Sequence, residues 1–477
     1  MTLAALAGAV RGGELSPREA VQDALDRIER LDPALNSFIT VRAEEALAEA
    51  KAFGLSTSGP LRGVPVAVKD VIDVAGTPTT AASKVLEDNV PTRDAAVVER
   101  LRRAGAIVVG KLNTHEFAFG ASTTSAAFGP AHNPWDNERI CGGSSGGSGA
   151  AVAAGLVTGA LGTDTAGSIR IPAALCGVTG IRPTTGRVPN RGVIPVSWTY
   201  DTVGPLARTA EDCALLLDAI AGPDPGDAST TTVPAEQCHE GLGRGISGLR
   251  IGVVSHLFDE VPLDPRVAAV VETALGELER LGARIERVDA RFLRRAEVVQ
   301  QLVMLPEAAE AHLPWLRTRL ADYGPDVRAR LLAGLLLPSS APITGQRARR
   351  ELAREARPLF DRFDLLASPE MPVVAPRIGE DPIEIAGQTM PYRLSLIPFN
   401  SPWSCLGLPT VSVPCGFVDR LPVGLALTGR RLAEATVLRA AHAYQQATDW
   451  HEQRPPIAVD ADSPEGVYTT QNSEKGE

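Results

Sequence analysis

Apolar residues recur along the chain with the periods of buried helices and strands. Between 17 and 30 they follow one another at intervals of three and four, directly after the capping box Ser16-Pro17-Arg18-Glu19, so a helix is predicted there. Residues 64–68 read Val-Pro-Val-Ala-Val, a short apolar run that is typical of a strand buried on both faces. This strand is expected to end at Lys69-Asp70.

Strands and helices alternate after this point. A helix is predicted over 95–104 and a strand over 106–109, which together with 64–68 indicate a strand–helix–strand crossover unit. The same two periods predict helices over 149–159, from Thr209, over 264–281, over 295–362 and over 432–447. They predict strands over 160–162, 249–254, 364–367, 410–413 and 423–427. The alternation indicates an α/β fold built on a buried sheet.

Three polar segments interrupt the pattern. Residues 121–148 are rich in Gly, Ser, Thr, Asn and Pro, and so long a loop inside a compact domain is usually functional. Residues 222–248 are polar and rich in turn formers, so they are expected to separate a catalytic half from a more variable half. From about 456 the apolar period stops, which predicts a disordered tail over 456–477.

Composition excludes some classes of partner. The 477 residues are 44% hydrophobic, enough for a large core, and the formal net charge is −10. That charge argues against a nucleic-acid backbone or an anionic membrane surface as the main partner. No apolar run approaches the roughly 20 residues that span a bilayer, and the first residues lack the basic stretch of a signal peptide.

The cysteines and lysines add two further inferences. The six cysteines lie far apart, without a CxxC pair or a Cys/His cluster, so neither a disulfide framework nor a metal site is expected, and no cofactor motif is present. Scattered reduced thiols indicate a cytoplasmic protein. Of the 47 basic residues only 5 are lysines and 42 are arginines. Because a buried lysine can lose its proton near neutral pH and an arginine cannot, Lys69 invites a chemical role.

The run Gly142–Ser148 is the main candidate for chemistry. It fits the G-x-S-x-G pattern twice, at Ser144 and Ser145, but 133–138 reads as loop, whereas a nucleophile elbow follows a strand. A phosphate-binding loop is excluded because no Gly-Lys-Ser/Thr follows. Alone, such a run is typical of a flexible loop. A second Gly-Ser step at Gly167-Ser168 and the rare Lys69 together indicate a serine hydrolase.

Longer motifs then match a known family. Residues 61–70 (Leu-Arg-Gly-Val-Pro-Val-Ala-Val-Lys-Asp), 142–148 and 162–173 (Gly-Thr-Asp-Thr-Ala-Gly-Ser-Ile-Arg-Ile-Pro-Ala) together resemble the amidase signature family, and 177–184 and 407–424 extend the match. The resemblance runs from about 5 to 455. It implies a large mixed β-sheet sandwiched between layers of α-helices, in one domain over 1–455. The catalytic core is expected at about 60–215 and the substrate-shaping region at about 236–400.

The resemblance also implies roles for three side chains. Ser168 resembles the nucleophile, and Ser144 resembles the serine that relays its proton, with the Gly143–Ser144 peptide in the cis form. Lys69 resembles the base, which must be neutral when it acts.

Backbone donors and an ion pair are expected around the nucleophile. By the same resemblance, the N–H groups of Thr165, Ala166 and Gly167, with that of Ser168 itself, form an oxyanion hole. The family more commonly has Gly-Gly-Ser here, so Ala166 puts the shape of the hole in question. Asp164 and Arg170 are expected to pair and support this loop, and Ser145 to support the relay serine.

Three functions stay open at this point. The first is a stand-alone amidase that cleaves a small carboxamide, anilide, carbamate or urea. The second is the glutaminase subunit of a tRNA-dependent amidotransferase, which in the family goes with a Tyr-led, Arg-containing stretch. Residues 340–352 hold no tyrosine, although Arg347, Arg349 or Arg350 could still bind glutamine's carboxylate. The third, a non-catalytic scaffold, is disfavoured because all three triad positions are occupied.

Specificity is expected to depend on three variable walls: Val193–Thr202, 300–345 and Pro398–Cys405. Aromatic side chains that could face a substrate there are Trp198, Tyr200, Phe399 and Trp403. The expected partner is a small amide-type molecule, without nucleic acid or membrane, and a homodimer is left open.

Overall fold

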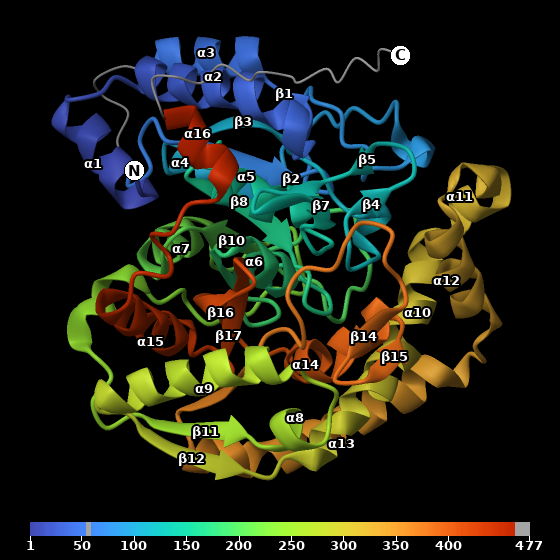
Figure 1. Ribbon diagram of the computed structural model, residues 1–477. Coiled ribbons are helices and arrows are strands. Elements are labelled where there is room, and N and C mark those ends of the chain that lie inside the picture. Colours follow the sequence, from blue (N-terminus) through green and yellow to red (C-terminus); the bar gives the residue numbers. More distant parts are fainter. Residues whose placement is uncertain (54–58, 463–477) are drawn as a thin grey trace, which may run out of the picture.

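One mixed β-sheet organises the chain in the computed structural model, which describes residues 1–53 and 59–462 (Figure 1). Within that part of the chain the sheet has 11 strands in the order β1-β3-β2-β8-β10-β9-β16-β17-β13-β11-β12. In this order the strands are β1 (Phe38–Val41), β3 (Ile107–Leu112), β2 (Pro65–Lys69), β8 (Gly159–Thr163), β10 (Val203–Ala207), β9 (Thr179–Arg182), β16 (Thr410–Val418), β17 (Leu421–Gly429), β13 (Leu365–Pro369), β11 (Arg250–Val254) and β12 (Arg284–Val288). The expected large mixed sheet is confirmed.

Helices pack around this sheet from one end to the other. In Figure 1, α2 and α3 lie at its β1 end, and α9 lies beside β11 and β12. The helices are α1 (Leu3–Gly12), α2 (Pro17–Leu35), α3 (Ala43–Ala52), α4 (Ala96–Arg103), α5 (Gly146–Ala153), α6 (Arg170–Cys176), α7 (Ala210–Ile220), α8 (His256–Asp259), α9 (Pro265–Arg280), α10 (Ala296–Ala311), α11 (Leu313–Thr318), α12 (Pro325–Leu336), α13 (Ser340–Arg362), α14 (Tyr392–Leu406), α15 (Glu434–Ala447) and α16 (Pro456–Asp462). Among the described residues, no helix is both long enough and apolar enough to cross a bilayer.

Strand β2 shows why its sequence reads as a continuous apolar run. It pairs in parallel with β3 on one side and with β8 on the other, so the predicted β2–α4–β3 crossover is confirmed. Val66 and Val68 belong to the apolar cluster that contains Leu101 of α4, whereas Ala67 belongs to a second cluster that contains Ala150 of α5. Both faces are therefore covered, as the resemblance implied. Because side chains alternate along a strand, Lys69 shares the α5 face with Ala67.

Helix α5 begins earlier than the sequence predicted. The expected range was 149–159, but the helix runs over Gly146–Ala153 and every residue in it is buried. A Cβ at Gly146 would lie 2.4 Å from Thr123 Oγ1, and one at Gly147 would lie 2.5 Å from the carbonyl oxygen of Ser37. The glycine–serine run is thus a tightly packed helix start, because only glycine leaves room for these close approaches.

Three other expectations differ in detail. The expected loop 121–148 contains two short antiparallel ladders, β4 (Thr124–Ser125) with β5 (Gly129–Pro130) and β6 (His132–Asn133) with β7 (Asp136–Ile140), and β14 (Ile383–Ile385) pairs with β15 (Gln388–Met390). The helical stretch 295–362 divides into α10 to α13. The tail expected to be disordered from 456 begins with α16, whose Ile457 joins an apolar cluster. Residues 463–477 lie outside the described part of the chain.

Helix α14 was not predicted at all. It spans Tyr392–Leu406 and contains Pro398 and Pro402, and prolines inside a segment usually argue against a helix because each removes a hydrogen bond. Twelve of its side chains are buried, so tertiary packing outweighs this loss. The helix brings Arg393, Leu396 and Ser401 to the same pocket as Ser168.

Candidate active site

Lys69 lies at the end of β2, where its amine contacts two hydroxyl groups. The side chain is completely buried. Its Nζ donates to Ser144 Oγ at 2.6 Å and to Thr163 Oγ1, at the end of β8, at 2.8 Å. Burial lowers the pKa of Lys69 to about 7, although the carboxyl groups of Asp164 and Asp201 act in the opposite direction. A neutral amine is therefore accessible near neutral pH.

Ser144 is held rigidly by its backbone. The Gly143–Ser144 peptide bond is cis. The Ser144 carbonyl oxygen accepts hydrogen bonds from the His115 N–H at 3.0 Å and from Thr114 Oγ1 at 2.8 Å. A Cβ at Gly143 would lie 2.7 Å from the backbone nitrogen of Ser122, so no side chain fits there. The hydroxyl group of Ser144 is thereby fixed against Lys69.

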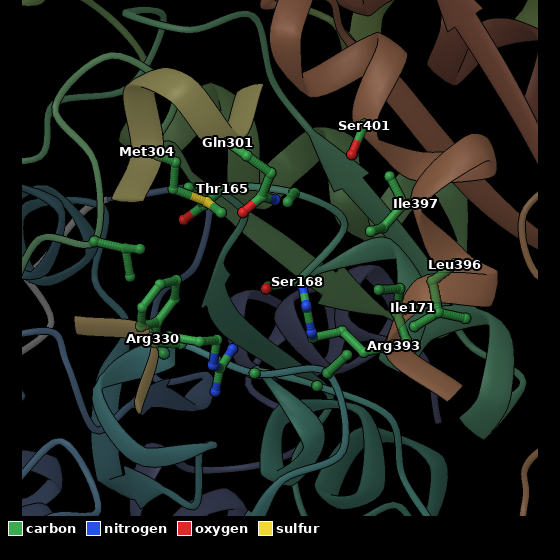
Figure 2. Close-up of a pocket in the computed structure, with 17 residues that line it drawn as sticks. Thr165, Ser168, Ile171, Gln301, Met304, Arg330, Arg393, Leu396, Ile397 and Ser401 are labelled. Atoms are coloured by element: carbon green, nitrogen blue, oxygen red, sulfur yellow. The ribbon is translucent and has the colours of Figure 1, made fainter. Parts of the chain in front are cut away.

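Ser168 lies in the turn between β8 and α6. Its carbonyl oxygen accepts the Ser145 N–H at 3.1 Å, while Ser145 Oγ donates to the Thr163 carbonyl at 3.2 Å. Ser145 thus ties the Ser144 turn to the Ser168 turn and to β8. Ser168 is 9% exposed and lines a pocket together with Gly143, and Figure 2 shows its hydroxyl oxygen at the centre of that pocket. The structure therefore places Lys69 against Ser144, and it joins the turn that follows Ser144 to the turn that holds Ser168.

A buried charge network supports this turn. Arg170 Nε pairs with Asp164 Oδ2 at 3.0 Å, as predicted, and Arg182 Nη1 lies 3.2 Å from Asp164 Oδ1. Burial alone would raise the pKa of Asp164, but the two guanidinium groups hold it well below its usual range. Arg182 comes from β9, a strand that the sequence did not predict, so nothing in the sequence linked it to Asp164.

The backbone donors differ from the expectation at one position. The Gly167 N–H donates to Asp164 Oδ1 at 2.8 Å, so it is not free to bind an oxyanion. The reason is that a fully buried carboxylate needs donors from its neighbours. Among the described residues, the N–H groups of Thr165, Ala166 and Ser168 have no hydrogen-bond acceptor. Gln300 Nε2 fixes the Thr165 carbonyl at 2.9 Å.

The predicted walls line the pocket, but their aromatic residues do not. Each of the three segments contributes to the pocket that contains Ser168, through Val196, Gln301, Met304, Arg330 and Ser401. Tyr200, Phe399 and Trp403 are core residues, which is the more common role of single aromatic side chains, and Trp198 is 52% exposed and outside the pocket lining. The aromatic ring at the pocket is that of Phe119.

The arginines at the pocket are not those considered from the sequence. Arg349 donates to the Cys405 carbonyl at 2.6 Å and lies over the Tyr200 ring, while Arg347 and Arg350 are exposed outside the pocket lining. Arg330 and Arg393 line the pocket instead. With 42 arginines in the chain, no local pattern distinguishes these two. In the described residues no three His, Cys, Asp or Glu side chains converge as metal ligands would.

Comparison with known proteins identifies the family. A family model described as Amidase matches residues 19–438. The chain therefore belongs to the amidase signature family, whose members share the fold and the motifs seen here.

Individual relatives cover nearly the whole chain. One of them, a glutamyl-tRNA(Gln) amidotransferase subunit of Moorella thermoacetica, is 41% identical over 94% of this chain and 96% of that relative. A solved structure from a vestigial protein complex, connected with the evolutionary origins of an s-triazine catabolic enzyme, is 37% identical with a TM-score of 0.89, over 94% of this chain and 98% of its own. A bacterial aryl acylamidase is 27% identical with a TM-score of 0.88, over 97% and 99%.

Proposed function

We propose that this protein hydrolyses the C–N bond of a small amide-type substrate through an ester on Ser168. The contact of 2.6 Å between Lys69 Nζ and Ser144 Oγ carries this proposal, because Gly143, the neighbour of Ser144, lines the pocket that contains Ser168. Neutral Lys69 takes the proton of Ser144 as Ser144 takes that of Ser168, and Ser168 Oγ bonds to the carbonyl carbon. The proton then returns through Ser144 to the departing nitrogen as the C–N bond breaks. Water hydrolyses the ester by the reverse relay.

The negative charge that develops on the carbonyl oxygen needs donors that are already in place. The N–H groups of Thr165, Ala166 and Ser168 are the candidates, since that of Gly167 is engaged by Asp164. One such donor typically contributes about 3–4 kcal/mol to the transition state. Ala166 keeps its N–H, so an alanine in place of the more common glycine is compatible with this role.

Covalent labelling tests the nucleophile. A fluorophosphonate probe is expected to label the wild-type protein and not Ser168→Ala, because the probe bonds to an activated serine oxygen. Mass spectrometry of the labelled peptide identifies the site. Ser148→Ala is a suitable control, since that hydroxyl donates to the Leu161 carbonyl and lies outside the pocket lining. A folded wild-type protein that takes no label would contradict the proposal and favour the scaffold.

The rate of labelling is expected to depend on the protonation of Lys69. Below pH about 7 the amine is protonated and cannot accept the relayed proton, because burial sets its pKa to about 7. The second-order labelling rate should therefore rise about tenfold per pH unit below this value and level off above it. Labelling measured from pH 5 to 9 checks this. A rate that falls as the pH rises through 7 would contradict a neutral lysine base.

A second candidate is the glutaminase subunit of a tRNA-dependent amidotransferase. The observation that favours it is the 41% identity to the glutamyl-tRNA(Gln) amidotransferase subunit of Moorella thermoacetica over almost the full length, a greater likeness than the 27% shared with the aryl acylamidase. The two candidates share the chemistry proposed for Ser168 and differ in substrate and assembly. Purification from the native host decides between them: a stable complex that releases ammonia from glutamine would favour this role.

A further inference from the structure

Two arginine side chains enter the pocket of Ser168 from separate elements. Arg330 comes from α12 and Arg393 from the first turn of α14. Figure 2 shows both side chains reaching toward the Ser168 hydroxyl group. Both also line a second hollow, here called the outer hollow, whose other lining residues include His115, Asp326, Arg377, Glu380 and Asp381. The two arginines therefore stand where the pocket meets the outer hollow. A substrate bound with its carbonyl at Ser168 would extend toward both guanidinium groups.

Arg330 is held in one position by its neighbours. Its Nη2 donates to Asp326 Oδ2 at 2.8 Å, and its guanidinium carbon lies 4.5 Å from the centre of the Phe119 ring. Asp326 also accepts a hydrogen bond from His115 Nε2 at 2.9 Å. The charge of Arg330 is thus partly balanced, but its Nη1 has no acceptor among the described residues. The group is pre-positioned for an additional acceptor.

Arg393 carries a charge that nothing nearby balances. Its side chain is exposed, and no carboxylate or carbonyl of the described residues accepts a hydrogen bond from it or pairs with it. By contrast, Arg377, which lines the outer hollow only, is paired with Glu138. An unpaired guanidinium beside a catalytic pocket is a suitable partner for a carboxylate, which it binds in a bidentate manner.

The rest of the pocket offers no site for a positive charge. No aspartate or glutamate of the described residues lines it, and its walls are apolar at Ile171, Met304, Leu396 and Ile397. Three carboxylates line the outer hollow, and each already has a donor. Asp326 accepts hydrogen bonds from Arg330 and His115, Glu380 accepts the Arg377 N–H, and Asp381 accepts the Tyr392 N–H at 3.0 Å. An ammonium group in the pocket would meet two arginines and no anion.

We propose that Arg393, together with Arg330, selects amides that carry a carboxylate and lack an ammonium group. This inference rests on the proposed hydrolysis at Ser168 and specifies its substrate class. The carboxylate of the substrate lies between the two guanidinium groups at the mouth, and the chain between carboxylate and amide lies against the apolar wall. Glutamine has the carboxylate but adds an ammonium group, which this pocket does not stabilise.

Three amides with the same five-carbon chain test the selection. Valeramide has no charge, glutaramate adds a carboxylate at the far end, and L-glutamine adds an ammonium group to glutaramate. The kcat/KM of the wild-type protein is expected to be about 10- to 100-fold higher for glutaramate than for either of the others. A higher value for glutamine, or equal values for all three, would overturn the proposal.

The Arg393→Gln variant assigns the effect to one side chain. It should lower kcat/KM for glutaramate about 10- to 100-fold, mainly through KM, and change that for valeramide less than about threefold, because only the carboxylate loses a partner. Arg393→Lys should restore part of the loss. Arg377→Gln, in the outer hollow, is the matched control and should leave all three values unchanged. Equal losses for all three substrates would show a structural role and overturn the selection.

Binding separates this proposal from the proposed hydrolysis. Glutarate titrated by calorimetry into Ser168→Ala protein is expected to bind, and to bind about 10- to 100-fold more weakly when Arg393→Gln is added. This readout needs no catalysis. If glutarate binds as expected but the protein shows neither labelling nor hydrolysis, the proposed hydrolysis is contradicted and the carboxylate selection is not. If Ser168 is labelled but Arg393→Gln does not weaken glutarate binding, the carboxylate selection is overturned and the hydrolysis is not.

Discussion

Replacing Lys69 with methionine is expected to slow labelling of Ser168, and hydrolysis of any amide substrate, by about 10²- to 10⁴-fold at pH 8. The variant removes the amine that donates to Ser144 Oγ at 2.6 Å and leaves the two serines without a proton acceptor. No histidine lines the pocket among the described residues, so no other base replaces it there. Residual activity would come from the backbone donors and from binding alone.

The variant is designed so that the loss can be attributed to chemistry. Methionine has a similar length and suits a site with no exposure to water, where a lysine is costly. Thermal unfolding of Lys69→Met is therefore expected at or above the wild-type temperature. Lys84→Met, at an exposed lysine, is the matched control and should label at the wild-type rate. A folded Lys69→Met protein with wild-type labelling would contradict the relay.

The variant should also lose the pH dependence described above. In the wild-type protein the rate rises up to pH about 7 because Lys69 loses its proton there. Without the amine, this rise should disappear, even if the remaining rate is low. A rise near pH 7 that persists in Lys69→Met would assign the titration to another group.

Much of the part of the chain that contains Lys69, Ser144 and Ser168 could be predicted, because its signals are local. Strand β2 has both faces buried, which gives a continuous apolar run ending at Lys69. Helix α2 carries the capping box at Ser16 and Glu19, and α7 begins after the capping residue Thr209. Such signals lie within a few neighbouring residues, so the sequence alone reveals them. The positions of Ser144 and Ser168 came from the resemblance of longer motifs.

The features of the site that the sequence did not predict depend on contacts between segments that are far apart in the chain. Asp201 accepts a hydrogen bond from Thr165, 36 residues earlier, and Glu370 lies beside Arg170, 200 residues earlier. Asp201 also accepts the N–H groups of Val196 and Ser197, but neither carboxylate has a sequence pattern that reveals its distant partner. Helix α14 was hidden by its two prolines, and Arg393 was missed with it. The parts that determine the substrate are therefore those that the sequence predicts least well.

Replacing Asp164 with asparagine is expected to destabilise the fold by about 3–5 kcal/mol at pH 5.5. Asp164, Arg170 and Arg182 are all fully buried, and the variant leaves two guanidinium groups facing a neutral amide. Breaking a buried ion pair costs this much because the remaining charges are no longer compensated. Denaturation by urea measures the loss, and Glu351→Gln, at an exposed ion pair on α13, should leave the transition unchanged.

The size of this loss should depend on pH through Glu370. In the wild-type protein burial raises the pKa of Glu370 to about 8, against the influence of Arg170, and the charge of Asp164 acts in the same direction as burial. Glu370 is thus protonated when folded and ionised when unfolded between pH 4.5 and 8, so wild-type stability falls as the pH rises through this window. Without Asp164, Glu370 is free to ionise beside Arg170, and this fall should be reduced or absent.

The difference in unfolding free energy between wild type and Asp164→Asn is therefore expected to be smaller at pH 8 than at pH 5.5. Glu370→Gln in both backgrounds is the control, because it removes the titrating group. With glutamine at 370 in both proteins, the difference should no longer change between these two pH values. A pH-independent difference with Glu370 present would show that the carboxyl group does not respond to Asp164. Asp164 would then be the carboxylate that compensates Arg170 and Arg182, and Glu370 would not replace it as their counter-ion when Asp164 is lost.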